Sequence, residues 1–485
     1  MIKFIKLSFF YKDMKQSSLR ELHLNIQKGQ CVLLCGASGC GKTTLTRLVN
    51  GLIPHFFEGN ISGKAIVKGL NVAETEISSL SDSVGTVFQN PRTQFFNTDT
   101  DSEIVFGLEN RMLETKELKQ QLERVVKDLH IEKLKGCSIF ELSGGEKQKI
   151  AFASVYATNP DIFVLDEPSS NLDFHSVLEL KKLIEKIKRQ GKTIIIAEHR
   201  LWYLTDIADR VILMQDGQVF KDMNIQDFCR LPVEQIQNMG LRCRNLSEIK
   251  TNINGKKNSE HSLELKDIHV KYGEKSILQN ISFSASGGEI VAITGANGTG
   301  KTTLARTICG LIKQKSGNIF VDGRSLSAKA RIKKSYMVMQ DVGHQLFTDC
   351  VETECTLGTK TTNESVIDET LSVLSLSELK NRHPLSLSGG QKQRLAVAIS
   401  LLCDKEILIF DEPTSGLDLK SMREVGTMVE RLSEQEKILL IITHDIEFIK
   451  TICSRVLLLS GGKIIADLRG EEKKNIEKYI LAEGD

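Results

Sequence analysis

Two short stretches decide the fold: "GASGCGKTT" at residues 36–44 and "GANGTGKTT" at residues 295–303. Each follows a short and almost wholly apolar run, "QCVLLC" or "EIVAIT", and precedes a helical pattern. A glycine loop between a buried strand and a helix can cradle phosphates, because its backbone N–H groups face the anion and the helix N-terminus favours negative charge. The chain therefore contains two predicted phosphate-binding units.

The similarity between the two halves extends far beyond these loops. "VFQNP" recurs as "VMQDV", "LSGGEKQKIAFA" as "LSGGQKQRLAVA", and "FVLDEPSSNLD" as "LIFDEPTSGLD", in the same order, followed in each half by a histidine after an apolar strand. Strands such as "TIIIAEH" and "ILLIITHD" carry polar residues at their C-terminal ends, where open α/β sheets bind ligands. The repeat predicts two tandem α/β domains of the P-loop type, each with a mostly parallel sheet.

The repeat also sets the expected domain limits. We expect a first domain at 1–220, with a helical subdomain at about 94–159, and a second domain at 263–485. The helical subdomain rests on "ELKQQLERVVKDL", whose apolar residues recur at helical spacing. The polar segment "KTNINGKKNSEHS" predicts that residues 221–262 form a flexible linker.

Composition narrows the class of protein. The chain has 485 residues with 64 Lys+Arg and 62 Asp+Glu, so it lacks the broad positive field typical of nucleic-acid binding, and we expect no nucleic-acid partner. Its apolar runs are far shorter than the ~20 residues that span a bilayer, which predicts a soluble protein or one attached to a membrane through a partner. The 11 cysteines are scattered, as expected for reduced thiols in the cytosol; Cys40, inside the first glycine loop, is either oxidisable or simply a small residue in a tight turn.

Each copy carries the side chains that phosphoryl chemistry needs. Lysines 42 and 301 are expected to reach the outer phosphates, and the hydroxyls of the threonines that follow them are expected to bind Mg²⁺. Each "DE" pair ends a strand, so its aspartate can hold the metal shell while its glutamate polarises the attacking water. A histidine in each half lies where an imidazole could contact the outer phosphate. The predicted catalytic residues are Glu167, His199, Glu412 and His444.

The two "LSGG" segments need a separate explanation. A serine and two glycines at the start of a helix form a second anion-binding terminus. A P-loop domain already has its own phosphate cradle, so this terminus needs a phosphate held by a facing copy.

Together these motifs resemble the nucleotide-binding domains of ABC ATPases, over nearly the whole chain outside the linker. In that family ATP is held between the P-loop of one domain and the LSGG of the other, which implies that the two halves form an intramolecular pseudo-dimer with two hydrolytic sites. The resemblance implies D-loop roles for Asp173 and Asp418, and adenine stacking for Tyr11 and Tyr272. The expected Mg²⁺ residues are Thr43, Gln89, Asp166, Thr302, Gln340 and Asp411. The expected ATP-binding residues are Tyr11, Gly36, Ser38, Gly39, Gly41, Lys42, Thr43, Thr44, Ser143, Gly144, Gly145, Tyr272, Gly295, Asn297, Gly298, Gly300, Lys301, Thr302, Thr303, Ser388, Gly389 and Gly390.

The segments that follow the two glutamines suggest a transport role. "QNPRTQFFNTDTDSE" and "QDVGHQLFTDCVETE" share a QxxxxQ(F/L)F pattern that looks like the ATPases of energy-coupling-factor importers. That resemblance implies a transmembrane coupling protein and a small substrate-binding membrane subunit as partners. It also implies a location at the cytoplasmic face of the cell membrane and a vitamin, vitamin precursor or transition-metal ion as cargo. The alternative for these segments is a hydrophobic patch buried against the helical subdomain.

Two other functions remain open at this stage. A soluble tandem ABC ATPase acting on the ribosome usually has a longer and strongly charged linker. A fused ATPase of another importer class, such as a sugar importer, tends to lack both a consensus LSGG and the QxxxxQ(F/L)F pair.

Overall fold

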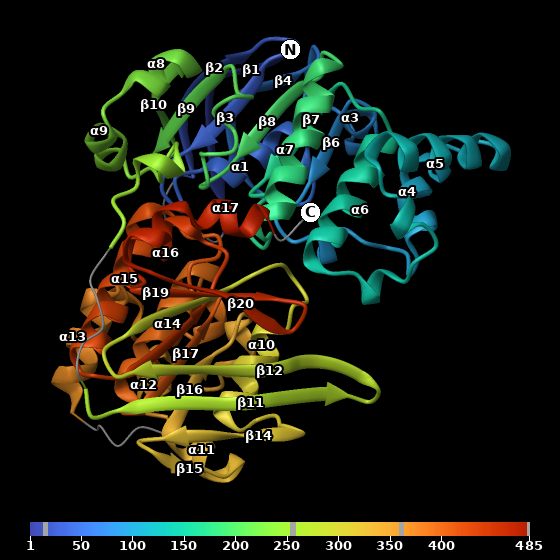
Figure 1. The fold of residues 1–485 in the computed structure, drawn as a ribbon. Coiled ribbons are helices and arrows are strands. Elements are labelled where there is room, and N and C mark those ends of the chain that lie inside the picture. Colours follow the sequence, from blue (N-terminus) through green and yellow to red (C-terminus); the bar gives the residue numbers. More distant parts are fainter. Residues whose placement is uncertain (13–17, 253–258, 358–362, 483–485) are drawn as a thin grey trace. The chain divides into compact units, whose positions relative to one another are not determined.

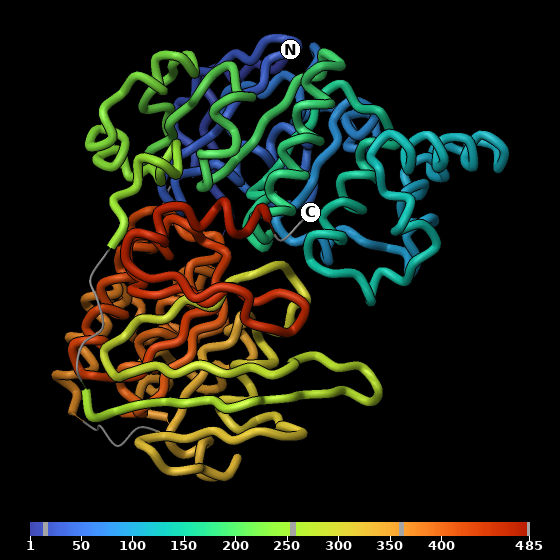
Figure 2. Tube along the Cα trace, viewed as in Figure 1, coloured from blue at the N-terminus to red at the C-terminus, as the bar shows by residue number. Residues whose placement is uncertain are grey.

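The computed structural model describes residues 1–12, 18–252, 259–357 and 363–482. Contacts divide the chain into two compact units, the first comprising Met1–Leu172 and Ser176–Asn245, the second Asp173–His175 and Leu246–Asp485. The colours of Figures 1 and 2 follow the chain through each unit.

Each unit is built on a six-stranded sheet, and the strand order is equivalent in the two copies. The orders are β10-β9-β3-β8-β7-β6 and β20-β19-β13-β18-β17-β16. Neighbouring strands are parallel except at the edge, where β10 and β20 run antiparallel to their neighbours. The strands are β3 (Cys31–Cys35), β6 (Val84–Val87), β7 (Ile162–Asp166), β8 (Thr193–Ala197), β9 (Arg210–Gln215), β10 (Gln218–Asn224), β13 (Ile290–Thr294), β16 (Ser335–Val338), β17 (Ile407–Asp411), β18 (Ile438–Ile442), β19 (Arg455–Ser460) and β20 (Lys463–Arg469).

A second, antiparallel sheet completes each unit. Its strand order is β2-β1-β4-β5 in the first unit and β12-β11-β14-β15 in the second. The predicted duplicated α/β fold is therefore confirmed. These strands are β1 (Ile2–Tyr11), β2 (Leu19–Ile26), β4 (Gly59–Val67), β5 (Leu70–Asn71), β11 (Ser262–Tyr272), β12 (Lys275–Ser286), β14 (Ser316–Val321) and β15 (Arg324–Ser325).

Helices cover the sheets (Figure 1). In the first half they are α1 (Lys42–Val49), α2 (Leu52–His55), α3 (Ile77–Ser81), α4 (Thr100–Glu109), α5 (Thr115–Leu129), α6 (Gly144–Ala157), α7 (Phe174–Arg189), α8 (Ile225–Arg230) and α9 (Val233–Asn238). In the second half they are α10 (Lys301–Cys309), α11 (Ala328–Lys334), α12 (Val351–Thr356), α13 (Glu364–Val373), α14 (Gly389–Leu402), α15 (Leu419–Glu434), α16 (Ile446–Thr451) and α17 (Ile476–Leu481). No helix within these described residues has the length and apolarity that crossing a membrane requires.

The central strands are buried on both faces, which explains their continuous apolar runs. In β3, Cys31, Leu33 and Cys35 pack into one hydrophobic core, whereas Val32 and Leu34 pack into another. Side chains alternate between the two faces of a strand, so one sheet separates two cores. This packing fixes the C-terminal ends of the strands, from which the polar motifs extend.

The helical subdomain of the first unit contains α4, α5 and α6, which lie together in Figure 1. Of the helical repeat in α5, Val125 and Leu129 are buried, and Leu118 and Leu122 are half-buried against the same core. The amphipathic pattern therefore faces the core as expected.

The first part of the predicted linker is folded, contrary to our expectation. Within 221–262, helices α8 and α9 form, and Phe228, Ile236 and Leu241 are buried in the core of the first unit. The two helices are too short to show a helical period, so the sequence pattern missed them. Residues 253–258, in the most polar part of that segment, lie outside the described residues.

Candidate functional site

The two glycine loops have the same backbone geometry. Gly36, directly after β3, has φ 141°, and Gly295, directly after β13, has φ 139°. A Cβ at these positions would lie 2.3 Å from the Met214 carbonyl oxygen and 2.0 Å from that of Leu459. Only glycine lets the loop approach the neighbouring strand this closely.

The P-loop lysines are buried and point back into their own loops. The ammonium of Lys42 donates hydrogen bonds to the carbonyls of Gly36 (2.9 Å) and Ala37 (3.0 Å). Lys301 makes the equivalent bonds to Gly295 (2.8 Å) and Ala296 (2.7 Å). Each loop thus holds the lysine ammonium against backbone carbonyl oxygens. Charged phosphate oxygens would bind the ammonium more strongly than these neutral carbonyls do.

A threonine hydroxyl and an aspartate lie together in each unit. Thr43 Oγ1 donates to Asp166 at 3.3 Å, and Thr302 Oγ1 donates to Asp411 at 2.9 Å. Burial, with the nearby charge of Glu167, raises the pKa of Asp166 to about 6, and burial raises the pKa of Asp411. Oxygen donors of this kind are the ligands that Mg²⁺ prefers, and a cation would return both carboxyls to the ionised state.

The two predicted catalytic glutamates share a strained backbone. Glu167 has φ 45° and Glu412 has φ 53°, in the left-handed region that costs a glutamate about 1–3 kcal/mol. Their amides donate to the carbonyls of Ala197 (2.8 Å) and Ile442 (2.9 Å) on the adjacent strand. The parallel sheet therefore holds both carboxylates in the same unusual orientation.

In the first unit, two predicted residues converge on Glu167. Gln89 Nε2 donates to its carboxylate at 2.7 Å, and His199 Nε2 lies 3.4 Å from its other oxygen. The glutamine, glutamate and histidine come from the ends of three different strands, β6, β7 and β8.

In the second unit, the partners of Glu412 are partly different. His444 Nε2 lies 3.5 Å from Glu412 and 3.1 Å from Asn297 Oδ1 of the glycine loop. Thr443 donates from its hydroxyl to Glu412 at 3.4 Å. Gln340 is exposed at the end of β16. Both units bring the glutamate and histidine together, but only the first joins its glutamine to them among the described hydrogen bonds.

Each LSGG serine begins a helix and caps it. Ser143 accepts a hydrogen bond from the Glu146 amide at 3.3 Å and donates from its hydroxyl to the Glu146 carboxylate at 2.8 Å. Ser388 accepts from the Gln391 amide at 3.4 Å. Glycines 144, 145, 389 and 390 form the first turns of α6 and α14. Free amides at these turns suit an anion, as the sequence suggested.

The two predicted D-loop aspartates also accept amide hydrogen bonds. Asp418 caps α15 by accepting from Ser421 at 2.8 Å. In the second unit, to which the contacts assign Asp173–His175, the Asn297 amide donates to Asp173 at 2.8 Å.

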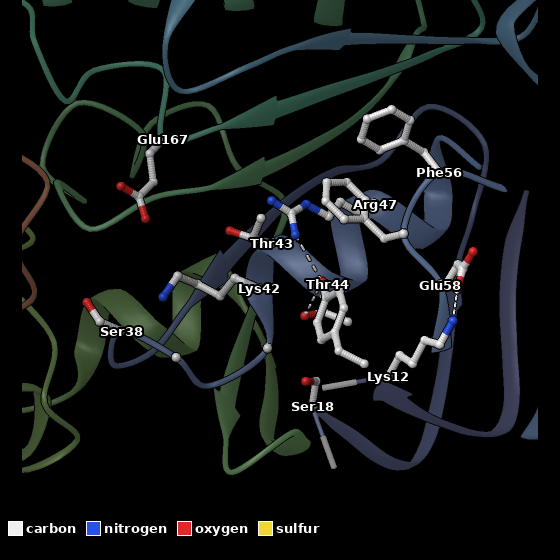
Figure 3. A pocket seen from close by; sticks show the side chains of 14 residues that line it. Lys12, Ser18, Ser38, Lys42, Thr43, Thr44, Arg47, Phe56, Glu58 and Glu167 are labelled. Carbon is white, nitrogen blue, oxygen red and sulfur yellow. Dashed lines mark hydrogen bonds and ion pairs between the residues drawn. The ribbon is translucent and has the colours of Figure 1, made fainter. Parts of the chain in front are cut away.

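The two predicted adenine-stacking tyrosines have different surroundings. Tyr11 lies in a pocket of about 860 Å³ that also contains Ser38, Lys42 and Glu167. Figure 3 shows Ser38, Lys42 and Glu167 toward one end of this pocket. Tyr272 ends β11 and is 51% exposed.

The sequence prediction missed the residues that shape the segments after the glutamines. The second glutamine of each QxxxxQ pattern folds back: Gln94 accepts from the Phe88 amide at 3.2 Å, and Gln345 accepts from the Met339 amide at 2.7 Å. These bonds close the turn that follows β6 and β16, so the pattern has a structural cause.

A buried glutamate then fixes the next residues in both copies. Glu103 accepts from the amides of Phe96 (3.0 Å) and Asn97 (2.8 Å). Glu354 accepts from the amides of Phe347 (2.9 Å) and Thr348 (2.8 Å). The recurrence of "SE" and "TE" at the same distance from the two glutamines could have identified this pair.

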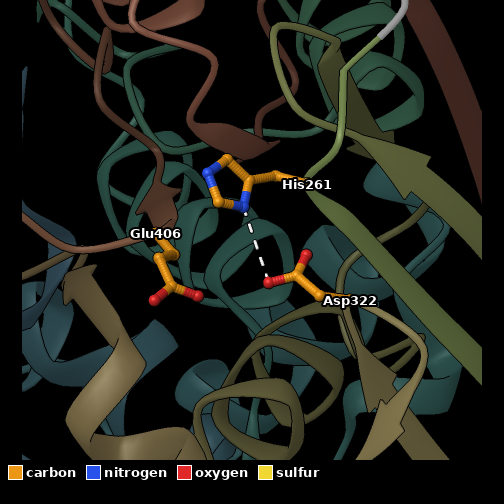
Figure 4. A group of neighbouring side chains, drawn as sticks. All are labelled: His261, Asp322 and Glu406. Carbon is orange, nitrogen blue, oxygen red and sulfur yellow. Dashed lines mark ion pairs between the residues drawn. The ribbon is translucent and has the colours of Figure 1, made fainter.

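A further group of possible metal ligands lies in the second unit. His261, Asp322 and Glu406 approach one another there (Figure 4). The Lys334 ammonium already pairs with Glu406 at 2.5 Å, so a cation at this exposed group would have to displace a charge. The threonine and aspartate pairs beside the glycine loops are the better metal ligands.

Comparisons with known proteins agree with the geometry. The sequence profile of the "ABC transporter" family matches residues 19–170 and 278–415. A Treponema denticola chain assigned as an ABC transporter ATP-binding protein is 65% identical over 486 residues, covering 99% of both chains. A Bacillus subtilis chain assigned as an HMP/thiamine import ATP-binding protein is 32% identical, covering 95% of this chain and 90% of its own.

Among solved structures, a model of ribosome-bound archaeal Pelota and ABCE1 contains a chain that is 20% identical with a TM-score of 0.73. The match covers 98% of this chain and 80% of that one. At this identity the likeness establishes the tandem fold alone.

Proposed function

Because the chain belongs to the ABC transporter family of ATP-binding proteins and is a tandem ATPase, we propose that it is the motor subunit of a membrane importer of the energy-coupling-factor type. In this proposal its partners are a transmembrane coupling protein and a small substrate-binding membrane subunit, and it works at the cytoplasmic face of the membrane. The name of the Bacillus subtilis relative, which includes HMP/thiamine import, favours a vitamin or vitamin precursor as cargo.

One observation carries this proposal: an exposed apolar patch that occurs at the same place in both units. Phe96 is 75% exposed and Phe347 is 75% exposed. Near the first, Phe140 is 77% exposed, and Leu385 occupies the equivalent position in the second copy with 51% exposed. In the first unit the two segments run side by side, because the Ile139 amide bonds to the Thr98 carbonyl at 2.9 Å. Apolar side chains held outward in duplicate favour a partner.

In the first unit, hydrogen bonds also connect the patch to the proposed chemistry. The Gln89 side chain bonds to Glu167, and a few residues later the backbone of Phe96 is held by Glu103. A movement of the glutamine on ATP binding would therefore shift the exposed phenylalanine. This gives a route from the site of hydrolysis to a membrane partner, which an ATP-driven importer requires.

The proposed chemistry assigns a role to each of the predicted residues. Lysines 42 and 301 bind the outer phosphates, and glutamates 167 and 412 orient and polarise water for attack. When bound, Mg²⁺ neutralises phosphate charge, and Thr43, Asp166, Thr302 and Asp411 are the residues that would hold it. The proposal includes the pairing implied by the family resemblance, with each LSGG serving the ATP of the opposite copy.

The deciding experiment is to purify the tagged chain from its native cells in mild detergent and identify the associated proteins by mass spectrometry. A polytopic membrane protein together with a small, very hydrophobic one supports the importer. Ribosomal proteins would instead establish the soluble alternative, and a pair of large permeases would indicate another importer class.

A double variant ties the result to the patch. Phe96→Ser with Phe347→Ser should remove the membrane partners while the purified chain still hydrolyses ATP. Phe220→Ser, at a 55% exposed position on β10, is the matched control and should retain the partners. Loss of partners in the control, or full retention in the double variant, contradicts the proposed docking surface.

A further inference from the structure

The first pocket contains an aromatic surface that the second copy lacks. Between α1 and β4 the first copy reads "GLIPHFFEGNISG", whereas the equivalent stretch between α10 and β14 reads "GLIKQKSG". The first copy is longer here, and the extra length includes Phe56 and Phe57, which line the pocket. Because one copy alone carries these residues, the two otherwise similar sites can bind the same ligand with different strength.

The aromatic rings of this surface contact one another in sequence. Tyr11 and Phe57 have ring centroids 6.3 Å apart at 89°, and Phe57 and Phe56 are 5.0 Å apart at 77°. The guanidinium carbon of Arg47 lies 4.0 Å from the centroid of Phe57, and Arg47 Nη1 donates to the Tyr11 hydroxyl at 3.1 Å. We call Tyr11, Arg47, Phe56 and Phe57 the aromatic wall.

The backbone holds the wall in place. The amides of Phe56 and Phe57 both donate to the Leu52 carbonyl at 2.9 Å, and Tyr11 pairs with Gly59 where β1 meets β4. Phe56 is nevertheless 72% exposed. The backbone therefore keeps these residues at the pocket, and the exposed ring of Phe56 is open to a planar ligand.

The wall and the P-loop lysine line the same pocket. Figure 3 shows Lys42, Ser38 and Glu167 on one side of the pocket, Phe56 and Glu58 on the other, and Thr44 and Arg47 between them. The Tyr11 hydroxyl lies 3.3 Å from Thr44 Oγ1, two residues after the lysine. A triphosphate on Lys42 therefore directs its base toward the wall, where aromatic and guanidinium planes suit a purine.

We propose that the aromatic wall stacks on the nucleobase in the first site and makes the two ATP sites of this chain unequal, the first binding ATP more tightly. The shorter stretch of the second copy contains no aromatic residue, and Tyr272, at the end of β11, is 51% exposed. This inference rests on the proposed placement of ATP in the glycine loops, and it is independent of the importer role.

Binding to single-site proteins tests it. Lys301→Ala leaves the first site and Lys42→Ala leaves the second, and ATP affinity is measured for each by calorimetry without a membrane partner. We expect the first site to bind ATP about tenfold more tightly, since alanine substitution of one stacking ring costs about 1–3 kcal/mol per base. Equal dissociation constants would overturn the proposal.

A double variant then isolates the base. In the Lys301→Ala background, Phe56→Ala with Phe57→Ala should weaken ATP about tenfold and leave inorganic tripolyphosphate unchanged. The matched control is Lys313→Ala with Lys315→Ala, at two exposed positions, in the Lys42→Ala background, which should change ATP affinity less than about twofold.

Three results would contradict the wall. Unchanged ATP affinity in the phenylalanine variant excludes stacking. Equal weakening of ATP and tripolyphosphate shows that the phenylalanines support the loop and do not bind the base. No ATP binding to the Lys301→Ala protein rejects the placement of ATP in the first loop, and the wall with it, while the partner experiment for the importer stands on its own.

Discussion

The turns that carry the two histidines are built differently around the same geometry. After β8 the chain reads Glu198-His199-Arg200, and after β18 it reads Thr443-His444-Asp445. The histidine lies 3.4 Å from the catalytic glutamate in the first unit and 3.5 Å in the second. The distance between the histidine and the glutamate is thus retained, although the residues that flank the histidine differ. This indicates that the placement of the histidine–glutamate pair matters more than the residues that hold it.

The supports use different sets of buried charges. Glu198 is buried and accepts from the Tyr203 hydroxyl at 2.9 Å and from three amides, while Arg200 donates to the carbonyls of Ser169 and Leu172, both at 3.2 Å. In the second unit Asp445 accepts from the Thr414 hydroxyl at 2.9 Å. The first unit therefore holds the loop before its D-loop with both a buried carboxylate and a buried cation, whereas in the second unit a buried carboxylate bonds to the equivalent loop.

The strongest test of the comparison is to disable each glutamate separately. Glu167→Gln and Glu412→Gln should each slow ATP hydrolysis by about 10²-fold or more, because a glutamine cannot accept the proton of water. Steady-state phosphate release measures this, with Glu123→Gln on exposed α5 as the control. A near-normal rate for either variant would show that the two supports produce unequal sites.

Removing the support in one unit should destabilise that unit alone. Glu198→Ala leaves four donors without their acceptor, which should lower the unfolding free energy of the first unit by about 4 kcal/mol. The only tryptophan, Trp202, lies in this unit, so its fluorescence during urea unfolding reports the loss. Asp445→Ala in the second unit should leave the tryptophan transition in place, and an equal shift would mean that the units unfold together.

The pH dependence of stability can be followed in the first unit by itself, although burial raises the pKa of the equivalent aspartate in both units. The pKa of Asp166 is raised to about 6 from 3.8, so its contribution is fully present below the unfolded pKa and is lost as pH rises through 6. At about 1.4 kcal/mol per pH unit, the nucleotide-free first unit should lose up to about 3 kcal/mol between pH 4 and pH 7.

Two substitutions assign that effect. Asp166→Asn should flatten the dependence followed by Trp202 fluorescence, and Asp411→Asn should not. If Asp411→Asn also flattens the pH dependence reported by Trp202, the two units unfold together and their pH dependences cannot be separated.

Much of this architecture follows from the repeat in the sequence. Each apolar strand ends in a polar motif, and because parallel strands share one edge, Gln89, Glu167 and His199 were expected to meet; the structure brings them together. Aligning the two copies identifies such residues because both copies keep them.

Other features of the structure were missed by the sequence prediction, each for its own physical reason. Phe56 and Phe57 lie in a stretch with no counterpart in the second copy, so the repeat gives no signal for the wall. Gln94 and Glu103, by contrast, recur in the second copy as Gln345 and Glu354, so the repeat marks their positions. It does not reveal that they bind nearby backbone amides, because a polar residue in a surface loop looks the same whether or not it makes such a bond. Helices α8 and α9 are held by a few separated apolar residues, Ile225, Phe228 and Ile236, which produce no period.

The smallest effect is expected from a difference in charge just after the LSGG motif. Glu146 accepts from the Ser143 hydroxyl at 2.8 Å, whereas Gln391 occupies the equivalent place in the second copy. Glu146→Gln removes a carboxylate from the first turn of α6, which should cost about 0.5 kcal/mol of stability and lower the KM for MgATP about twofold, since the charge repels phosphate. Gln391→Glu should do the reverse, and steady-state kinetics of both variants measure the exchange. If Glu146→Gln instead raises KM, then the carboxylate serves the site by positioning Ser143, and the two LSGG motifs bind phosphate by different means.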